Sequence, residues 1–377
     1  AGLRSRHRAP LANTDERLCG RFKIDRSREL HEWSVLVTGG AGFIGGALLE
    51  ELKGAGVRNV VGVDNFNTYY SPELKRARAR QLRDVGVQVH DRSVCDSEFL
   101  DHLQKEHMFT HVVHLAAYAG PRYSVRNPIA YVKSNVECST HLLETIRQWE
   151  PRPRLLFSST SSAYGDTHNT TETAVLKPLH QYGASKVALE EMVKVYYRIY
   201  GLAAVGFRLF TVYGPWGRPD AAVYLFTEQV SKGEVVQLYN QGLCKRSFTY
   251  VSDAITGIIK LMFLRPLEPN MFNIGNPGEV LVSDLLELIE KEVGKQAKRE
   301  YLDSVVDALA KPADITKAKT CVGFDPKVPI EEGVRLSVEW YNQHSRSVYL
   351  TGDFLDLNVV SGKTGKSVNV QLHEKRQ

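Results

Sequence analysis

Several features that define large classes of proteins are missing from this sequence. Its 377 residues contain no run close to the roughly 20 consecutive apolar residues that span a membrane, and no hydrophobic signal peptide stands at the start. These absences predict a soluble protein without a membrane span. The twelve histidines form no His-Glu-x-x-His pattern, and the cysteines lack metal-ligand spacing, so no metal site is expected.

Cysteine is scarce, and the five residues are scattered and odd in number. Such usage is typical of a reducing compartment. The cytoplasm is therefore the expected location, and an organelle matrix or lumen is the alternative if residue 1 follows a removed targeting segment. The residues concerned are Cys19, Cys95, Cys138, Cys244 and Cys321.

An excess of charge is missing from most of the chain, although the net charge is +5. Residues 1–33 carry eight basic against five acidic residues, residues 346–377 carry five against three, and residues 34–345 are neutral in sum. A basic groove for nucleic acid is therefore not expected, and the basic ends are candidate attachment arms. The first twelve residues, with three arginines and no acid, fit either the remains of a targeting segment or a disordered leader.

A glycine-rich turn between a strand and a helix is the first feature that points to a ligand. A short β-branched strand is followed by Gly39, Gly42 and Gly45 and then by leucines at helical spacing. Glycines at this spacing let the backbone turn sharply and approach a pyrophosphate at the helix N-terminus. The next strand, 60–63, ends at Asp64, a carboxylate that accepts hydrogen bonds from a ribose and repels a 2′-phosphate. The pattern predicts NAD rather than NADP.

The segment Tyr182-Gly-Ala-Ser-Lys186 places a phenol and an ammonium one helical turn apart, on one face of the expected helix. Tyrosine ionises at about pH 10, so a phenolate that works at neutral pH needs a positive neighbour to lower its pKa. We expect Lys186 to be that neighbour, with a bound nicotinamide cation adding to the effect. On its own the pair is also compatible with two surface residues of an amphipathic helix.

Strand and helix patterns alternate along the chain from residue 34 onward. This rhythm predicts an α/β fold: a doubly wound parallel sheet of Rossmann type with helices on both faces, and a smaller α/β lobe for the substrate. The expected strands lie near 35–37, 60–63, 87–90, 111–115, 154–157 and 203–207. The expected helices lie near 43–54 and 130–148, at Tyr182–Lys186 as part of a long helix, and near 282–294 and 330–342.

These patterns suggest a division of the chain into four parts. A basic extension (1–33) precedes an NAD-binding domain (34–207), a substrate-binding lobe (208–345) and a tail (346–377). Within the lobe, about 246–265 is expected to return to the first domain. The tail contains strand-like stretches at 348–350 and 367–370 without a partner that the sequence identifies.

Three longer stretches carry a resemblance to a known family: 64–75 (DNFNTYYSPELK), 119–124 (AGPRYS) and 210–220 (FTVYGPWGRPD). Several such stretches in the family's order are far more specific than a glycine turn. The chain resembles an extended short-chain dehydrogenase/reductase of the NAD-dependent epimerase/dehydratase group. It is most similar to the UDP-glucuronate 4-epimerases, over about residues 34–345.

The resemblance implies a reaction and its catalytic residues. Thr160 takes the place of the family's catalytic Ser/Thr, which hydrogen-bonds the sugar 4-hydroxyl and helps Tyr182, beside Lys186, to take its proton. A hydride from C4 then passes to NAD, and its return to the opposite face of a 4-keto sugar inverts C4. UDP-glucuronate would become UDP-galacturonate, with NAD regenerated in each cycle.

Residue 162 is expected to separate inversion from decarboxylation. Related dehydratases and UDP-glucuronate decarboxylases usually carry a glutamate where this chain has Ser162. A 4-keto glucuronate loses CO₂ when the bond to its carboxylate aligns with the carbonyl π system. The neutral hydroxyls of Ser161, Ser162 and Thr211 are candidates to hold the carboxylate out of that alignment. Epimerisation is therefore favoured.

The resemblance also implies the remaining ligands. Arg122 and Arg218 are expected to bind substrate, Arg246 to bind the UDP diphosphate through two oxygens, and Asp253 to lie on the substrate side. The residues expected to line the cofactor are Gly39, Gly42, Phe43, Ile44, Gly45, Asp64, Asn65, Asn67, Leu115, Ala116, Ala117, Asn135, Ser158, Tyr182 and Lys186.

The binding residues depart from the family pattern in several places. Where the family has a Gly-Asp pair for adenine, this chain has Arg92-Ser93, so one anchoring carboxylate is missing. The other departures are Ser247 and Ser252 in place of acids, Leu225 in place of a lysine, and Val306 and Ala308 around Asp307 in the late loop.

Three functions fit this combination. The first is C4 epimerisation of a UDP-sugar, most of all UDP-glucuronate. The second is epimerisation or decarboxylation of another nucleotide sugar. The third is a structural subunit that keeps NAD while its terminal extensions dock it into a larger assembly. By analogy with the family we expect a homodimer through a helix bundle that includes 131–148 and 183–200.

Overall fold

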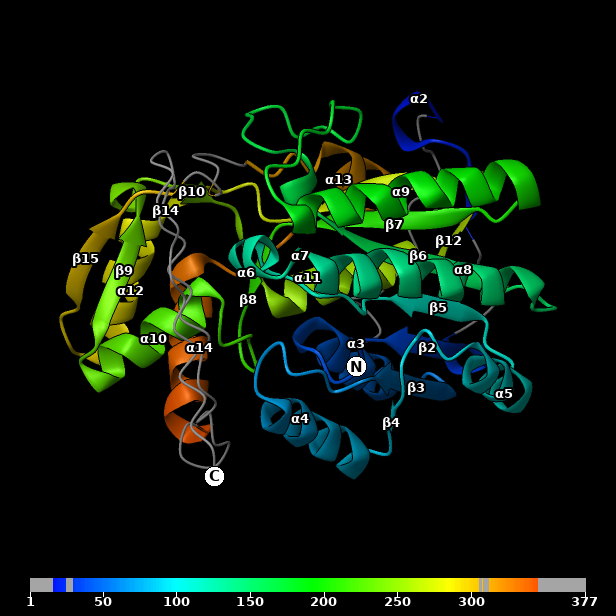
Figure 1. Ribbon diagram of the computed structural model, residues 1–377, viewed down its shortest axis with the longest axis horizontal. Helices are drawn as coiled ribbons and strands as arrows, with labels where there is room; N and C mark the ends of the chain where they lie inside the picture. Colours follow the sequence, from blue (N-terminus) through cyan, green and yellow to red (C-terminus); the bar gives the residue numbers. More distant parts are fainter. Residues whose placement is uncertain (1–15, 25–29, 305–306, 308–311, 345–377) are drawn as a thin grey trace.

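A seven-stranded parallel sheet forms the centre of the protein in a computed structural model, which describes residues 16–24, 30–304, 307 and 312–344 (Figure 1). The strand order is β13-β7-β6-β5-β2-β3-β4, and every neighbouring pair is parallel. The predicted α/β fold with a doubly wound parallel sheet is confirmed. The strands are β2 (Ser34–Thr38), β3 (Asn59–Asp64), β4 (Gln88–Asp91), β5 (His111–His114), β6 (Arg154–Thr160), β7 (Ala204–Leu209) and β13 (Asn270–Ile274).

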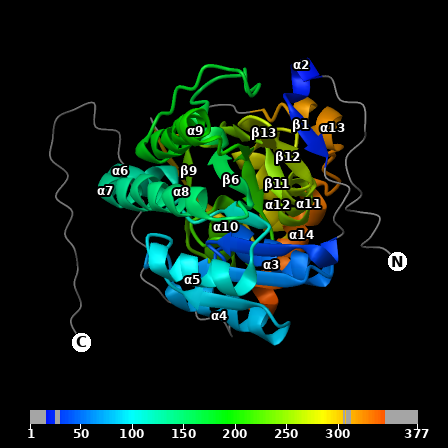
Figure 2. The same ribbon diagram turned by 90° about the vertical axis from the view of Figure 1, so that its right-hand side faces the viewer.

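Each face of the sheet has its own apolar core, because successive side chains of a buried strand point to opposite faces. The helices involved are α3 (Phe43–Gly54) and α11 (Val251–Met262) on one face, and α5 (Ser97–His107), α8 (Cys138–Gln148) and α9 (Gln181–Tyr200) on the other. Val35 and Val37 pack in the core of α3 and α11, whereas Leu36 packs in the core of α8 and α9. Figure 2 shows α8 and α9 on one side of β6 and α11 on the other.

The turn between β2 and α3 requires glycine at two positions. Gly39 has a φ of +73°, in the left-handed region that side chains disfavour. A Cβ on Gly45 would lie 2.1 Å from the carbonyl oxygen of Gly39, so no larger residue fits there without moving the backbone. The N-terminus of α3 therefore approaches the end of β2 closely, at the carboxyl edge of the sheet.

A smaller lobe packs beside this edge and appears on the left of Figure 1. It contains two short two-stranded pairings, β10–β14 and the parallel β9–β15, covered by three helices that contact one another. A third pair, β8–β11, is also parallel, as β9–β15 is, and joins the lobe to the sheet domain. The elements are β8 (Thr211–Tyr213), α10 (Ala222–Lys232), β9 (Val235–Tyr239), β10 (Lys245–Arg246), β11 (Phe248–Tyr250), β14 (Val280–Leu281), α12 (Val282–Val293), β15 (Lys298–Leu302) and α14 (Ile330–His344).

Two disulfides overturn the interpretation of the cysteines. Cys19 in α2 (Glu16–Cys19) is bonded to Cys321 in α13 (Thr316–Val322), and Cys95 is bonded to Cys138 at the start of α8. The expectation of a reducing compartment rested on scattered positions, and the pairing of four of the five cysteines removes that support, because the fold brings distant positions together. Cys244 is free and buried.

The remaining elements complete the frame. The helix expected near 130–148 is interrupted, because α7 (Pro128–Tyr131) leads into a wider π-helical turn, η2 (Val132–Glu137), before α8 begins. Among the described residues, no helix is long and apolar enough to cross a membrane. The expectations for the first twelve residues and for 348–350 and 367–370 fall outside the described residues. The other elements are β1 (Phe22–Ile24), η1 (Leu30–Glu32), α4 (Pro72–Asp84), α6 (Pro121–Arg126), η3 (Ser161–Ala163), η4 (Asn240–Gly242) and β12 (Leu264–Pro266).

Candidate active site

A cavity of about 450 Å³ lies between the carboxyl edge of the sheet and the smaller lobe, the place where doubly wound sheets bind ligands. It brings together residues expected from separate parts of the sequence. Those that line it are Gly39, Gly42, Phe43, Ile44, Gly45, Asp64, Asn65, Asn67, Leu115, Ala116, Ala117, Arg122, Ser158, Thr160, Ser161, Ser162, Tyr182, Lys186, Thr211, Arg218 and Arg246.

Two expected site residues do not line the cavity. Asn135 is buried in η2, where its amide accepts from the Tyr118 N–H at 2.8 Å and donates to the Tyr118 carbonyl and the Ser185 hydroxyl. It therefore positions the loop after β5. Asp253 accepts the backbone N–H groups of Lys327 and Val328, both at 2.9 Å, so it ties α11 to the segment before α14.

The cofactor wall is formed by backbone and by one carboxylate. The glycine turn forms a cradle of backbone at the N-terminus of α3, packed so closely that a Cβ on Gly45 would lie 2.1 Å from the carbonyl oxygen of Gly39. Asp64 accepts the N–H of Ala41 at 3.2 Å and of Phe66 at 2.8 Å, which fixes the carboxylate at the end of β3. These residues fit a dinucleotide, with the pyrophosphate at the helix N-terminus and the ribose at Asp64.

The part of this wall that follows β3 and β4 contains contacts that the sequence did not reveal. The buried Lys75 donates from Nζ to both the carbonyl and the side-chain oxygen of Asn67, each at 2.9 Å. Arg92 lies over the ring of Phe99, 5.7 Å from its centroid, and also lines the cavity. The loop that contains Arg92 is tied to α8 by the Cys95–Cys138 disulfide, and Cys138 lines the cavity as well.

The expected catalytic trio meets at the junction of β6 and α9. Thr160 ends β6, and its hydroxyl accepts the N–H of Ser162 at 3.1 Å. Lys186 is buried, and its Nζ donates to the carbonyl of Ser158 at 3.0 Å and to its hydroxyl at 3.3 Å. Burial lowers the pKa of Lys186 to about 8, against the opposing charge of Glu190.

The pKa of Tyr182 is raised above the usual value of a phenol. Burial at the cavity wall disfavours the phenolate, whereas hydrogen bonding with Thr160 and the charge of Arg218 oppose that effect. Asp220 raises the pKa of Tyr182 further. The cation that opposes the effect of burial on the pKa of Tyr182 is Arg218, while the Lys186 ammonium donates to Ser158.

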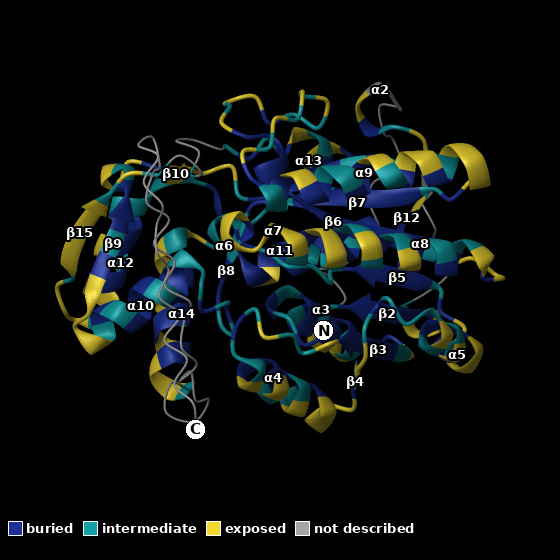
Figure 3. Ribbon diagram, in the orientation of Figure 1, coloured by how far each residue is buried: buried dark blue, intermediate teal, exposed yellow. Residues whose placement is uncertain are grey.

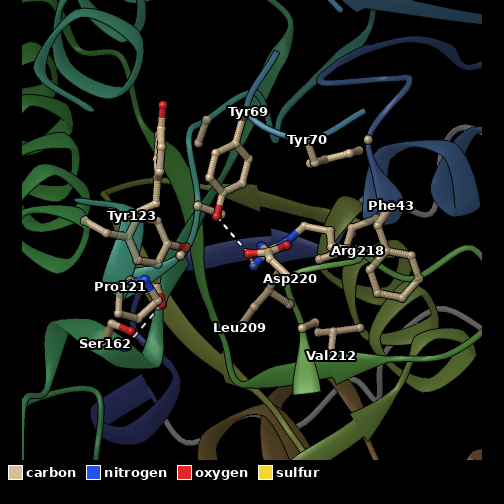
Figure 4. Close-up of a pocket in the computed structure, with 18 of the residues that line it drawn as sticks. Phe43, Tyr69, Tyr70, Pro121, Tyr123, Ser162, Leu209, Val212, Arg218 and Asp220 are labelled. Atoms are coloured by element: carbon tan, nitrogen blue, oxygen red, sulfur yellow. Dashed lines mark hydrogen bonds and ion pairs between the residues drawn. The ribbon is translucent and has the colours of Figure 1, made fainter. Parts of the chain in front are cut away.

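Arg218 belongs to a partly buried group that Figure 4 shows in the middle of the cavity. Its Nε and Nη2 bind the two oxygens of Asp220, each at 2.9 Å, and Tyr69 donates its hydroxyl to Asp220 at 2.8 Å. Burial and the carboxylate hold the pKa of Tyr69 well above its usual range. In the sequence, Asp220 and Tyr69 stand only within the motif stretches 210–220 and 64–75, and their contact could not be predicted from positions 151 apart.

A second group lies at the smaller lobe. Arg122 donates from Nη2 to Asp307 at 3.0 Å and stacks on Tyr239, with its guanidinium 3.7 Å from the ring centroid. Arg246 approaches the other oxygen of Asp307 at 3.6 Å. Although burial favours the neutral carboxyl, Arg122 and its neighbours hold the pKa of Asp307 below its usual range. The departures at Val306 and Ala308 lie outside the described residues.

Metal ligands are not clustered here: among the described residues, no group of three or more His, Cys, Asp or Glu side chains could hold a metal ion. The site is built instead from glycines, hydroxyls, two lysines and arginine–carboxylate pairs. This arrangement can bind a dinucleotide along one wall and an anionic ligand along the other.

A parallel sheet with this turn and this Thr-Tyr-Lys trio defines a dinucleotide-binding α/β protein. Residues 35–275 match the model of the NAD dependent epimerase/dehydratase family, and the chain belongs to that family. UDP-glucuronate 4-epimerase 4 of Arabidopsis thaliana is 37% identical over 328 residues, which cover 82% of this chain and 75% of the relative.

Solved structures show the same relationship. The crystal structure of UDP-glucuronic acid 4-epimerase from Bacillus cereus with UDP-glucuronic acid and NAD superimposes with a TM-score of 0.78 at 30% identity, covering 82% of this chain and 99% of that one. The NAD complex of UDP-glucose 4-epimerase from Thermus thermophilus gives a TM-score of 0.73 at 31% identity with the same coverage. The resemblance expected from the sequence is confirmed.

Proposed function

We propose that this protein is an NAD-dependent isomerase that interconverts UDP-glucuronate and UDP-galacturonate by inverting C4 of the sugar. The observation that carries the proposal is the shared cavity, in which Thr160, Tyr182 and Lys186 lie between a dinucleotide wall and two arginine groups. Similarity to UDP-glucuronate 4-epimerases supports the choice of substrate. We assign NAD chiefly to residues 34–207 and the sugar nucleotide chiefly to 208–345, with about 246–265 returning to the first domain.

The chain's own residues manage the proton. When bound, NAD supplies the acceptor that takes and returns the hydride of C4. Tyr182 takes the proton of the 4-hydroxyl at its phenolic oxygen and returns it after inversion. Thr160 and Arg218 both lower the cost of the phenolate, against the effect of burial. Lys186, fixed on Ser158, adds positive charge one helical turn from Tyr182.

The substrate's negative charges explain the other side chains. We assign the diphosphate to Arg122 and Arg246, because guanidinium groups bind phosphate oxygens in pairs. In the structure these two arginines share Asp307, so the diphosphate would either displace that carboxylate from the two guanidinium groups or bind them beside it. We assign the C5 carboxylate to the hydroxyls of Ser161, Ser162 and Thr211, with no acid at position 162 to repel it.

Incubation of the purified protein with UDP-glucuronate and NAD tests the proposal. NMR should show UDP-galacturonate at the expense of UDP-glucuronate, without added reductant and without net formation of NADH. Formation of UDP-xylose and CO₂ would assign decarboxylation instead. Turnover of UDP-glucose but not UDP-glucuronate would assign a different nucleotide sugar, and no turnover of any UDP-sugar with NAD bound would contradict an enzymatic role.

We also propose a homodimer formed through α7, η2 and α9. Ile129, Val132, Val195 and Ile199 are apolar side chains with exposed fractions of 41–63% on these neighbouring helices. Exposed apolar residues along neighbouring helices favour a protein interface. Light scattering of the purified chain should give twice the chain mass, and Val195→Glu with Ile199→Glu should give the monomer. A wild-type monomer, or a stable complex only with other proteins, would overturn the assignment.

A further inference from the structure

A single tripeptide, Asn169-Thr170-Thr171, fits the acceptor pattern for N-linked glycans, asparagine followed by any residue except proline and then by serine or threonine. The other asparagines of the chain lack a hydroxyl two positions later. The tripeptide lies in the loop between η3 and α9, which none of the NAD or UDP-sugar assignments uses. The proposed function therefore does not explain its presence.

The fold holds this tripeptide with the asparagine outward. Thr170 is buried, donates its hydroxyl to the Pro312 carbonyl at 2.6 Å, and accepts at its own carbonyl from Asn273 at 2.6 Å. Asn169 beside it is exposed, and its side-chain oxygen accepts from the N–H of Thr171 at 3.2 Å and its hydroxyl at 3.0 Å. The anchored Thr170 thus directs Asn169 into solvent.

The position leaves room for a large attached group. The loop lies at the top of Figure 1, and Figure 3 shows exposed stretches along it. No residue from 165 to 179 lines the ligand cavity. The proposed dimer helices expose Ile129 and Ile199 elsewhere on the surface. A glycan on Asn169 is therefore compatible with ligand binding.

The disulfides supply an independent observation that points to the same compartment. Cys19–Cys321 and Cys95–Cys138 pair four of the five cysteines, which is typical of proteins that fold in an oxidising lumen and rare in the cytoplasm. N-linked transfer takes place in such a lumen on secretory-pathway chains. The two pairs favour an oxidising compartment over the cytoplasm expected from cysteine scarcity.

We propose that Asn169 is an N-glycosylation site and that the protein folds in an oxidising secretory lumen. The co-substrate is a lipid-diphosphate-linked oligosaccharide. The amide nitrogen of Asn169 forms a bond to the anomeric carbon of the first sugar, the bond from that carbon to the diphosphate oxygen breaks, and the lipid diphosphate leaves while the amide loses one proton. No oxidant or reductant takes part.

Peptide mapping of the full chain isolated from the cells that make it tests the proposal directly. The peptide that contains Asn169 should carry a hexosamine-based glycan, and digestion with peptide N-glycosidase should convert Asn169 to aspartate. Non-reducing maps should contain both Cys19–Cys321 and Cys95–Cys138. An unmodified Asn169 in that chain would overturn the proposal, whatever the disulfides show.

Expression of the full chain behind a secretory leader supplies matched variants. Asn169→Gln and Thr171→Ala should each remove the whole glycosidase-sensitive mass, whereas Thr171→Ser should retain it. Epimerase turnover should stay within about twofold in all three variants, because the loop lies outside the cavity. A glycosidase-sensitive mass that persists in Asn169→Gln would place the glycan elsewhere and contradict the assignment to Asn169.

Discussion

The two walls of the cavity are built by different means. The cofactor wall consists of backbone and buried side chains at the ends of β2, β3 and β6, fixed by the glycine turn and by the contact of Lys186 with Ser158. The substrate wall consists of ion pairs between loops and the smaller lobe, centred on Asp220 and Asp307. Backbone geometry tolerates little substitution, whereas ion pairs can exchange partners with an anionic ligand. We therefore expect changes to the first wall to act through shape and changes to the second to act through charge.

We expect the largest effect on turnover from removing the hydroxyl of Tyr182, which lies between the cofactor wall and the substrate wall. Tyr182→Phe removes the phenolic oxygen that takes the proton and should lower turnover by about 10²–10⁴-fold. Bound NAD, measured after release from the denatured protein, should remain at the wild-type level. Turnover within tenfold of wild type would mean that another group is the base.

A larger residue in the glycine turn should prevent NAD from binding along the cofactor wall. Gly45→Ala places a methyl group 2.1 Å from the Gly39 carbonyl, so NAD should no longer be retained and the free energy of unfolding should fall by about 1–3 kcal/mol. Thermal unfolding and cofactor content measure both effects. Gly54→Ala on the same helix is the control, because its added methyl has no neighbour within 4 Å, and it should retain NAD. Equal behaviour of the two variants would refute the cradle.

A charge change should affect the second wall alone. Arg246→Ala should raise the KM for UDP-glucuronate about tenfold, as expected for a lost charge-assisted hydrogen bond, with NAD affinity unchanged. Arg92→Ala removes an arginine from the cofactor end and should leave the KM for the sugar nucleotide as it is. If Arg92→Ala had the larger effect on that KM, the assignment of the walls would be reversed.

The pH dependence should report the pairing between Arg218 and Asp220. Asp220 raises the pKa of Tyr182, so Asp220→Asn should lower it and shift the acidic limb of the rate profile to lower pH. Tyr69→Phe leaves the carboxylate charged while removing one hydrogen bond, and it should shift the profile less. A shift to higher pH in Asp220→Asn would show that Asp220 acts in another way.

The smallest effect on turnover should come from the disulfides, and it should differ between them. Replacing both Cys95 and Cys138 by serine should weaken NAD binding several-fold, because Cys138 and the loop at Arg92 line the cavity. Replacing both Cys19 and Cys321 should leave NAD binding unchanged. The loss of either disulfide should lower the free energy of unfolding by about 2–4 kcal/mol. If the two double variants bound NAD equally well, the Cys95–Cys138 disulfide would have no role at the cofactor site.

Most of the sheet could be predicted from sequence because its strands are apolar runs separated by helical patterns. β13 was not predicted. It is only five residues long, and it joins the sheet from a part of the chain that begins after position 269. The chain must first leave the sheet, build part of the smaller lobe and return. No local pattern describes such a return, and only the pairing with β7 reveals it.

The candidate site, too, could be predicted only in part. The glycine turn, Asp64 and the Thr160, Tyr182 and Lys186 trio could be named because short motifs carry them. The partners of these residues could not, because helical spacing places Lys186 near Tyr182 without fixing where the ammonium points. The contacts of Asp220 and Asp307 join positions far apart, and they depend on the packing of loops that have no periodic pattern.

In the oxidising lumen proposed above, the two disulfides would also set an order of events during synthesis. Their cysteines are 43 and 302 positions apart, so at about 5–20 residues per second the second thiol emerges roughly 2–9 s after the first in one case and 15–60 s in the other. Cys95 and Cys138 can therefore crosslink while the ribosome is still making the smaller lobe. Cys19 must wait for almost the entire chain, and during that wait it can react with Cys95. A disulfide isomerase that corrects such early mispairing would then govern the yield of the native protein.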